Sequence, residues 1–202
     1  MNDMVYSSSA LSARTALYML NHARIQSLVR ARNWGVAMKI LDDCDYENTS
    51  GTIDAIIDAE RKRTHQTFLQ HFPDPAVCAC VNALYNFGTT KIPTNKTLNH
   101  AEEELHEIFK DAVPKIKNPQ IRAYFRCYLH SWGHGHRVHE HDLWKHAHEM
   151  RLDLDGGGYV FYWYVLKQNE LIAVRIILGG LNLNLGRDAI LSHLGGLYDR
   201  FK

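Results

Sequence analysis

The chain has 202 residues, which is enough for one large domain or two small ones with a buried core. Hydrophobic residues make up 46% of the sequence and charged residues 22%, so extensive disorder is not expected. With 23 Lys and Arg against 22 Asp and Glu, the net charge is only +1. This balance argues against a broadly basic nucleic-acid-binding protein.

The sequence also argues against secretion and against a membrane span. The first ten residues are polar, so we expect no signal peptide. The longest apolar runs, Tyr159–Leu166 and Leu171–Leu178, are too short to cross a bilayer, and Arg175 interrupts the second. Four cysteines are too few for a disulfide scaffold, so we expect reduced thiols and a cytoplasmic location. They are Cys44, Cys78, Cys80 and Cys127.

The N-terminal part of the chain has the apolar spacing of helices. Leucine and isoleucine recur at helical intervals over 11–32, and 34–41 predicts a second helical piece. After an acidic turn over 42–51, Thr52 is a candidate N-cap for a helix that reaches about residue 71. Within that helix, the basic run Arg61–Arg63 is interpreted as a solvated face.

Three further helix starts are predicted by capping residues. Asp74–Pro75 and Asn118–Pro119 each place a capping side chain before a proline, which predicts helices over 75–87 and 119–130. Asn99 with Glu102 resembles a capping box and predicts a helix from 99 to about 112. The polar stretch 88–98, which contains Pro93, is the candidate linker.

The C-terminal part predicts a central buried helix. Residues 159–178 are apolar on nearly every face, and Gly179–Gly180 is expected to end the helix. A loop over 182–186 and a short helix over 187–194 follow. Glu170 and Arg175 interrupt the apolar helix and, five positions apart, do not form a standard pair along it. Each needs another partner if it is buried.

No run of alternating residues argues for a sheet, so the predicted fold class is all-α. We expect a single helical domain over 1–202, with room for two lobes of packed antiparallel helices at about 1–92 and 99–202.

Histidines gather in one segment between positions 130 and 148. Pairs such as His130 and His134 have the spacing at which two imidazoles on one helix can bind the same metal ion. Histidines seven positions apart are separated by about 10.5 Å on a helix and cannot share an ion. A metal site is therefore one interpretation, and solvated imidazoles on a polar face are the other. The seven are His130, His134, His136, His139, His141, His146 and His148.

An enzymatic alternative rests on the doublet His141–Asp142. It is similar to the doublet of HD-type metal phosphohydrolases, which are all-helical enzymes. That resemblance implies His106, His141, Asp142 and Asp188 as metal ligands. The templates of serine hydrolases, P-loop proteins and dinucleotide-binding proteins are absent from the sequence.

The most specific pattern lies in the segment from Gly156 to the C-terminus. An aromatic and apolar helix is followed by Lys-x-x-Glu-x-x-x-x-Arg-x-Ile-Leu, a loop with glycine and a short helix before a tyrosine. This segment resembles the C-terminal signature of the C-type (also called d-type) central-stalk family of V-type and archaeal-type ATPases and ATP synthases. Weaker similarity covers Asn21–Ile25 and Leu41–Tyr46, and a degraded match covers Leu84–Lys91. The residues that match the signature are Lys167, Glu170, Arg175, Ile177, Leu178, Gly186, Ile190 and Tyr198.

The resemblance implies a mechanical function without catalysis, cofactor or metal. Members of the family are helical funnels of three lobes that connect the rotating axle to the membrane ring during proton or sodium transport, and this chain is a short version. The implied partners are axle and ring subunits, with membrane contact only through the complex. The resemblance also implies residues that hold the lobes together, chiefly by structural ion pairing. These are Arg24, Tyr46, Glu170, Arg175 and Tyr198.

Three alternatives stay open beside this interpretation. They are an HD-type metal phosphohydrolase, a histidine-rich metal-binding or pH-sensing helical protein, and a helical adaptor unrelated to rotary ATPases.

Overall fold

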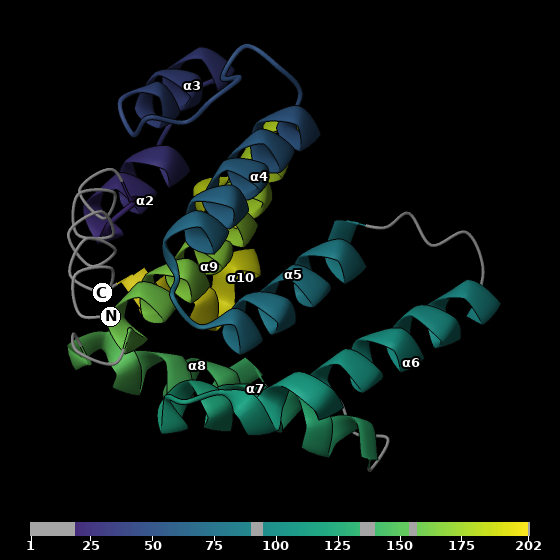
Figure 1. Cartoon of the computed structure of the whole chain (residues 1–202). Helices are drawn as coiled ribbons and strands as arrows, with labels where there is room; N and C mark the ends of the chain where they lie inside the picture. The colour runs from purple at the N-terminus through teal and green to yellow at the C-terminus, as the bar shows by residue number, and fades with distance from the viewer. Residues whose placement is uncertain (1–18, 90–94, 134–139, 154–156, 202) are drawn as a thin grey trace. The chain divides into compact units, whose positions relative to one another are not determined.

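The computed structural model describes residues 19–89, 95–133, 140–153 and 157–201, and leaves out the side chains of 89–100 and 131–141 (Figure 1). Within these ranges the backbone forms helices and no strand, which confirms the predicted all-α fold class. The α-helices are α2 (His22–Val29), α3 (Trp34–Asp42), α4 (Ile53–His71), α5 (Pro75–Thr89), α6 (Asn95–Ala112), α7 (Pro119–Gly133), α8 (Glu140–Glu149), α9 (Gly158–Asn182) and α10 (Arg187–Leu194). The 3-10 helices are η1 (Val113–Lys115), η2 (Met150–Leu152) and η3 (Gly195–Phe201).

The chain divides into two compact units. Unit 1 is built on Thr67–Trp163, and unit 2 combines the residues up to Gln66 with those from Tyr164 onward. Two helices, α4 and α9, pass from one unit into the other. The lobes expected from the sequence, about 1–92 and 99–202, divide the chain differently, because each of the two predicted segments contributes residues to both units.

Unit 1 is organised by helix caps that also contact one another. The Asp74 carboxylate accepts hydrogen bonds from the Ala76 and Lys117 backbone N–H groups, at 2.9 and 3.1 Å. Asn118 caps α7 in the same way, accepting from Gln120 N at 2.9 Å, and its amide donates to Asp153 at 2.6 Å. The predicted starts at Pro75 and Pro119 are therefore confirmed.

The core of unit 1 is aromatic. Phe109 and Phe125 are fully buried and meet edge to face, with ring centroids 5.3 Å apart. Phe161, at the start of α9, packs against Phe125 and against Phe68 at the end of α4. Rings with this geometry attract one another beyond the burial of their area.

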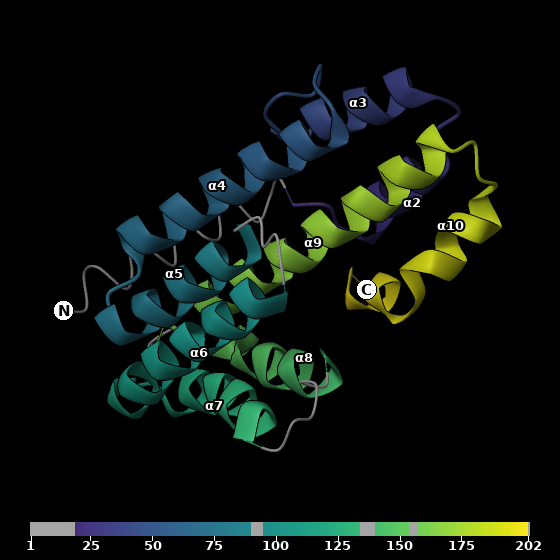
Figure 2. The same cartoon turned by 90° about the vertical axis from the view of Figure 1, so that its right-hand side faces the viewer.

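Unit 2 packs α2, α3, α10 and the larger parts of α4 and α9 around one apolar cluster. Asp54 of α4 contacts Arg175 of α9, and Glu60 contacts Lys167, so the two helices run antiparallel, as Figures 1 and 2 show. The fully buried members of the cluster include Ile25, Leu28, Leu41, Ile56, Ile57, Val174, Ile177 and Leu178.

Two predicted helix starts are wrong. The helix expected over 11–32 covers only His22–Val29 of the described residues, because the Asn21 side chain caps it by accepting from Arg24 N at 3.0 Å. Residues 11–18 lie outside the described ranges. The helix expected from residue 99 begins at Asn95, inside the candidate linker. The four residues before Asn99 contain no glycine or proline, so nothing local stops the helix from extending upstream.

The predicted end of the central helix is also wrong, because α9 runs through Gly179–Gly180 to Asn182. It ends where Asn184 adopts a positive φ of 54° and the Leu185 N–H donates to the Gly180 carbonyl at 2.9 Å. Gly180 permits close packing of α10, since a Cβ at this position would lie 2.6 Å from Ile190 Cγ1. In the described part of the chain, no helix is long and apolar enough to cross a membrane.

The two glycines of α9 predict opposite effects of an added methyl group. Gly180→Ala should destabilise unit 2 by about 1–3 kcal/mol, because the new Cβ collides with the buried Ile190 side chain. Gly179→Ala is the matched control: its Cβ meets nothing within 4 Å, so it should stabilise the helix by about 0.5–1 kcal/mol. Urea unfolding followed by circular dichroism measures both, and equal effects of the two variants would contradict this packing.

Candidate functional site

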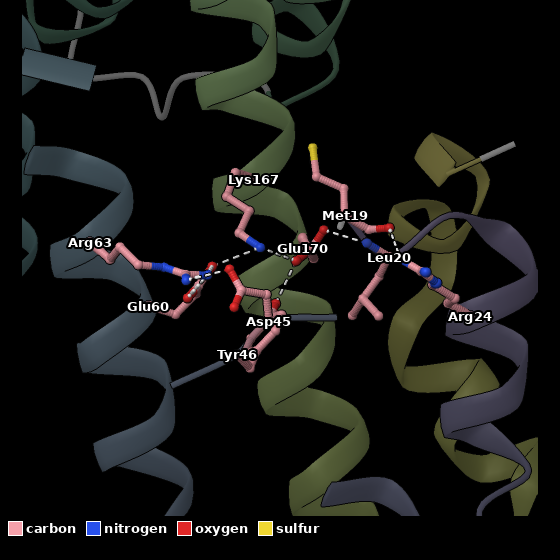
Figure 3. A network of polar contacts seen from close by, with 9 residues as sticks. All are labelled: Met19, Leu20, Arg24, Asp45, Tyr46, Glu60, Arg63, Lys167 and Glu170. Carbon is pink, nitrogen blue, oxygen red and sulfur yellow. Dashed lines mark hydrogen bonds and ion pairs between the residues drawn. The ribbon is translucent and has the colours of Figure 1, made fainter. Parts of the chain in front are cut away.

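The most unusual polar feature of unit 2 is a carboxylate with no exposed surface. Glu170 lies on α9 at 0% relative exposure. Its Oε1 accepts from the Tyr46 hydroxyl at 2.6 Å and from Lys167 Nζ at 2.5 Å, and its Oε2 accepts from the Leu20 backbone N–H at 2.8 Å (Figure 3). A buried charge is tolerated only when it is paired and hydrogen-bonded, and here both oxygens are.

Lys167 connects this carboxylate to a second one. It lies one helical turn before Glu170 on α9 and also contacts Glu60 of α4, with Nζ 2.8 Å from Oε1. Its ammonium group lies 4.5 Å from the centroid of the Tyr46 ring. Burial alone would lower the pKa of Lys167, but the carboxylates of Glu170 and Glu60 outweigh it and raise that pKa. The lysine therefore stays charged within the network.

The network reaches the surface through Arg63. Glu60 is buried at 1% exposure, and the Arg63 guanidinium contacts its Oε2 at 2.7 Å. The same guanidinium contacts Asp45 at 2.9 Å, and the Asp45 side chain is 65% exposed. The basic run Arg61–Arg63, interpreted from sequence as solvated, thus supplies one half-buried ion-pair partner. Two buried carboxylates are balanced by one lysine and one arginine.

A tight turn brings Tyr46 into this network. Asp45 has a positive φ of 61°, and the Tyr46 N–H donates back to the Leu41 carbonyl at 3.1 Å. The turn directs the phenol into the core, where Tyr46 is only 4% exposed. Burial, and then the charge of Glu170, raises its pKa well above the ordinary value. Tyr46 therefore acts as a neutral hydrogen-bond donor.

Arg24 contacts the peptide group that Glu170 holds. Its Nη1 donates to the Met19 carbonyl at 3.3 Å, and the Leu20 N–H of the same peptide group donates to Glu170. Met19 and Leu20 precede the helix, so their buried backbone groups need such partners.

Tyr198 fixes the C-terminal end of unit 2 against α2. It lies on η3, and its ring centroid is 4.8 Å from that of His22, the first residue of α2. Its hydroxyl is 3.4 Å from His22 Nε2. Arg200, two residues later, donates to the buried Asn169 of α9 at 2.8 Å. The C-terminal segment is thereby attached to both helices.

Arg175 lies outside the buried network. Its side chain is 47% exposed, and its partner at 3.0 Å, Asp54, is 76% exposed. The expectation that removing Arg175 costs several kcal/mol required an otherwise unpaired buried carboxylate, and this condition is not met. Solvent screens such a pair and reduces its contribution to stability.

Sequence reasoning missed Glu60, although the pattern of α4 contains the signal. The buried positions of this helix include Ile56, Ile57, Thr64 and Phe68, which recur at helical spacing. Glu60 falls in the middle of that stripe. A charged residue on an otherwise buried face indicates a paired core charge rather than a solvated surface.

The candidate metal ligands are not assembled by the described residues. His106 lies on α6 and Asp142 on α8, both in unit 1, whereas Asp188 lies on α10 in unit 2. His141 is the second residue of α8, but its side chain lies outside the description, as do residues 134–139 with three of the histidines. Across the described side chains, no group of three or more His, Cys, Asp or Glu could hold a metal ion.

The described histidines of the cluster show varied surroundings. His130 is exposed near the end of α7. His146 and His148 lie in the last turn of α8, where the His148 ring packs near Trp144 with centroids 5.7 Å apart. Burial, and then the charge of Arg151, lowers the pKa of His148.

The cysteines are free thiols, as predicted. Burial, together with the charge of Asp74, raises the pKa of Cys78 to about 11 and that of Cys80 to about 12. Thiols with such pKa values are protonated near neutral pH and react slowly.

The Glu170 network is built to hold segments together. Each carboxylate oxygen of Glu170 is occupied by a donor from this chain, and the donors come from three separate segments: the N-terminal residues, the turn at Tyr46 and α9 itself. Comparison of the chain with protein-family models, with curated proteins and with solved structures finds no match.

The two charged residues that interrupt α9 predict very different mutational costs. Glu170→Gln should destabilise unit 2 by about 3 kcal/mol, because it removes the charge that partners Lys167 in the buried network. Arg175→Gln, the matched control on the same helix, should cost less than about 1 kcal/mol, because its ion pair is exposed to solvent. Urea unfolding provides both values. Similar costs for the two variants would rule out this assignment.

The raised pKa values of Lys167 and Tyr46 predict loss of stability at alkaline pH. Above about pH 10 the unfolded chain releases these protons while the folded chain keeps them. Their stabilising contribution is therefore complete below the ordinary pKa values and is lost as pH rises through the raised ones. The unfolding free energy should fall less steeply between about pH 9 and 11 in Tyr46→Phe, by up to about 1.4 kcal/mol per pH unit. Equal slopes in the wild type and the variant would contradict the assignment.

Proposed function

We propose that the chain is a non-catalytic adaptor in the central stalk of a V-type or archaeal-type rotary ATPase or ATP synthase. In this function it links the rotating axle to the membrane ring, and its partners are subunits of those two assemblies. The adaptor needs no cofactor. It is cytoplasmic and contacts the membrane only through the complex.

One observation carries the proposal. The resemblance to the C-type (d-type) central-stalk family rests on separate stretches of sequence, and residues from two of them contact each other in unit 2. Tyr46, from the N-terminal match, donates to Glu170, from the C-terminal signature, at 2.6 Å. Lys167 of the same signature contacts the same oxygen at 2.5 Å. A chance similarity in two short segments gives no reason for their polar residues to converge.

The physical character of the network suits a part that transmits force. Buried, fully partnered charges leave few alternative arrangements, because each wrong register strands a charge in the core. The antiparallel pair α4 and α9 is connected in this way through Glu60 and Lys167. A torque-transmitting adaptor needs such resistance to sliding between helices.

Recovery of bound partners tests the proposal. The tagged chain is expressed in its source organism and purified from detergent-solubilised membranes, and the co-purifying proteins are identified by mass spectrometry. The proposal predicts recovery of axle, ring and head subunits together. Tagged Gly180→Ala is a useful companion, because a less stable unit 2 should reduce the yield of the complex.

The contradicting outcome is recovery of the chain alone from an extract in which native electrophoresis shows an intact rotary ATPase. Metal analysis of the tag-free protein then separates the alternatives. A bound metal together with phosphohydrolase activity that is lost in His141→Ala favours the HD-type enzyme. A bound metal without turnover favours the metal-binding protein.

A further inference from the structure

The peptide group between Met19 and Leu20 is held on both sides by side chains of opposite charge. Its carbonyl oxygen accepts from Arg24 at 3.3 Å, and its N–H donates to Glu170 at 2.8 Å (Figure 3). In a trans peptide the C=O and the N–H point in opposite directions, so a donor on one side and an acceptor on the other satisfy the group completely. The cation faces the negative end of the peptide dipole and the anion faces its positive end.

We propose that Arg24 and Glu170 form a clamp that allows the N-terminal junction, Met19–Asn21, to detach from unit 2 while α4 and α9 stay paired. The clamp and the α4–α9 connection use different contacts. Oε2 of Glu170 faces Leu20, whereas Oε1 faces Tyr46 and Lys167. Opening the junction therefore leaves the second set of contacts intact.

The α4–α9 connection has further support that does not involve the junction. Lys167 keeps Glu60 at 2.8 Å, and Glu60 keeps Arg63 at 2.7 Å. Outside the clamp, the junction is held chiefly by the buried Leu20 side chain and by the capping residue Asn21, which is itself exposed. Segments with few contacts open locally before the rest of a fold does. The junction is thus a conformational device at the start of the described chain, separate from the function proposed above.

Hydrogen exchange of individual backbone amides tests the clamp in the full chain. Arg24→Gln should speed exchange of the Leu20 amide about tenfold, the effect of losing one charge-assisted hydrogen bond. Amides of Glu60–Thr64 in α4 and of Lys167–Leu171 in α9 should stay within about twofold of their wild-type rates. Arg175→Gln is the matched control, because it removes an arginine from unit 2 without touching the clamp.

Two results would overturn the proposal. One is unchanged exchange at Leu20 in Arg24→Gln, and the other is a parallel increase at Leu20, α4 and α9. Glu170→Gln supplies a second variant that removes the opposite side of the clamp. Because it also weakens the network, the expected result is an increase at Leu20 about tenfold greater than the increase in α4 and α9. Equal increases in that variant would also contradict local opening.

Discussion

Burial of the Glu170 carboxylate is the constraint on which unit 2 depends. An ionised carboxyl group with no exposed surface is stable only where donors surround it, and this chain brings them from three separate segments. Each donor fixes something else: the Leu20 N–H fixes the path into α2, Tyr46 fixes the turn after α3, and Lys167 connects α9 to Glu60 on α4. The apolar cluster supplies most of the free energy of burial, while the charges select one arrangement of the helices.

The sequence predicts those features of the fold whose causes are local. Capping by Asp74, Asn118 and Thr52 depends on hydrogen bonds within three residues, and all three helix starts are found where expected. The end of α9 could not be predicted in this way. Gly179–Gly180 has the composition of a helix terminus, but Gly180 is required for contact with Ile190, ten residues further along the chain. Tertiary packing overrides the local signal there.

The candidate site follows the same rule. Glu170 can be identified from sequence because a charge in an apolar helix demands a partner, but its partners lie up to 150 residues away and cannot be read from spacing. The same reasoning applies to Arg175, yet it faces solvent beside Asp54. The two positions differ in helical phase, which Leu171, Val174 and Leu178 on the buried face define. Glu60 could have been found from the buried stripe of α4, since it shares the face of Ile56 and Thr64.

The central claim is that Glu170 and Lys167 act as one buried ion pair that organises unit 2. A double-mutant cycle measures it most directly, with urea unfolding of the wild type, Glu170→Gln, Lys167→Met and the double variant. In the double variant Glu60 retains Arg63 and no charge of the pair is stranded. The account predicts that the double variant loses less stability than the sum of the single losses, by about 1–3 kcal/mol. Additivity within about 0.5 kcal/mol would contradict it.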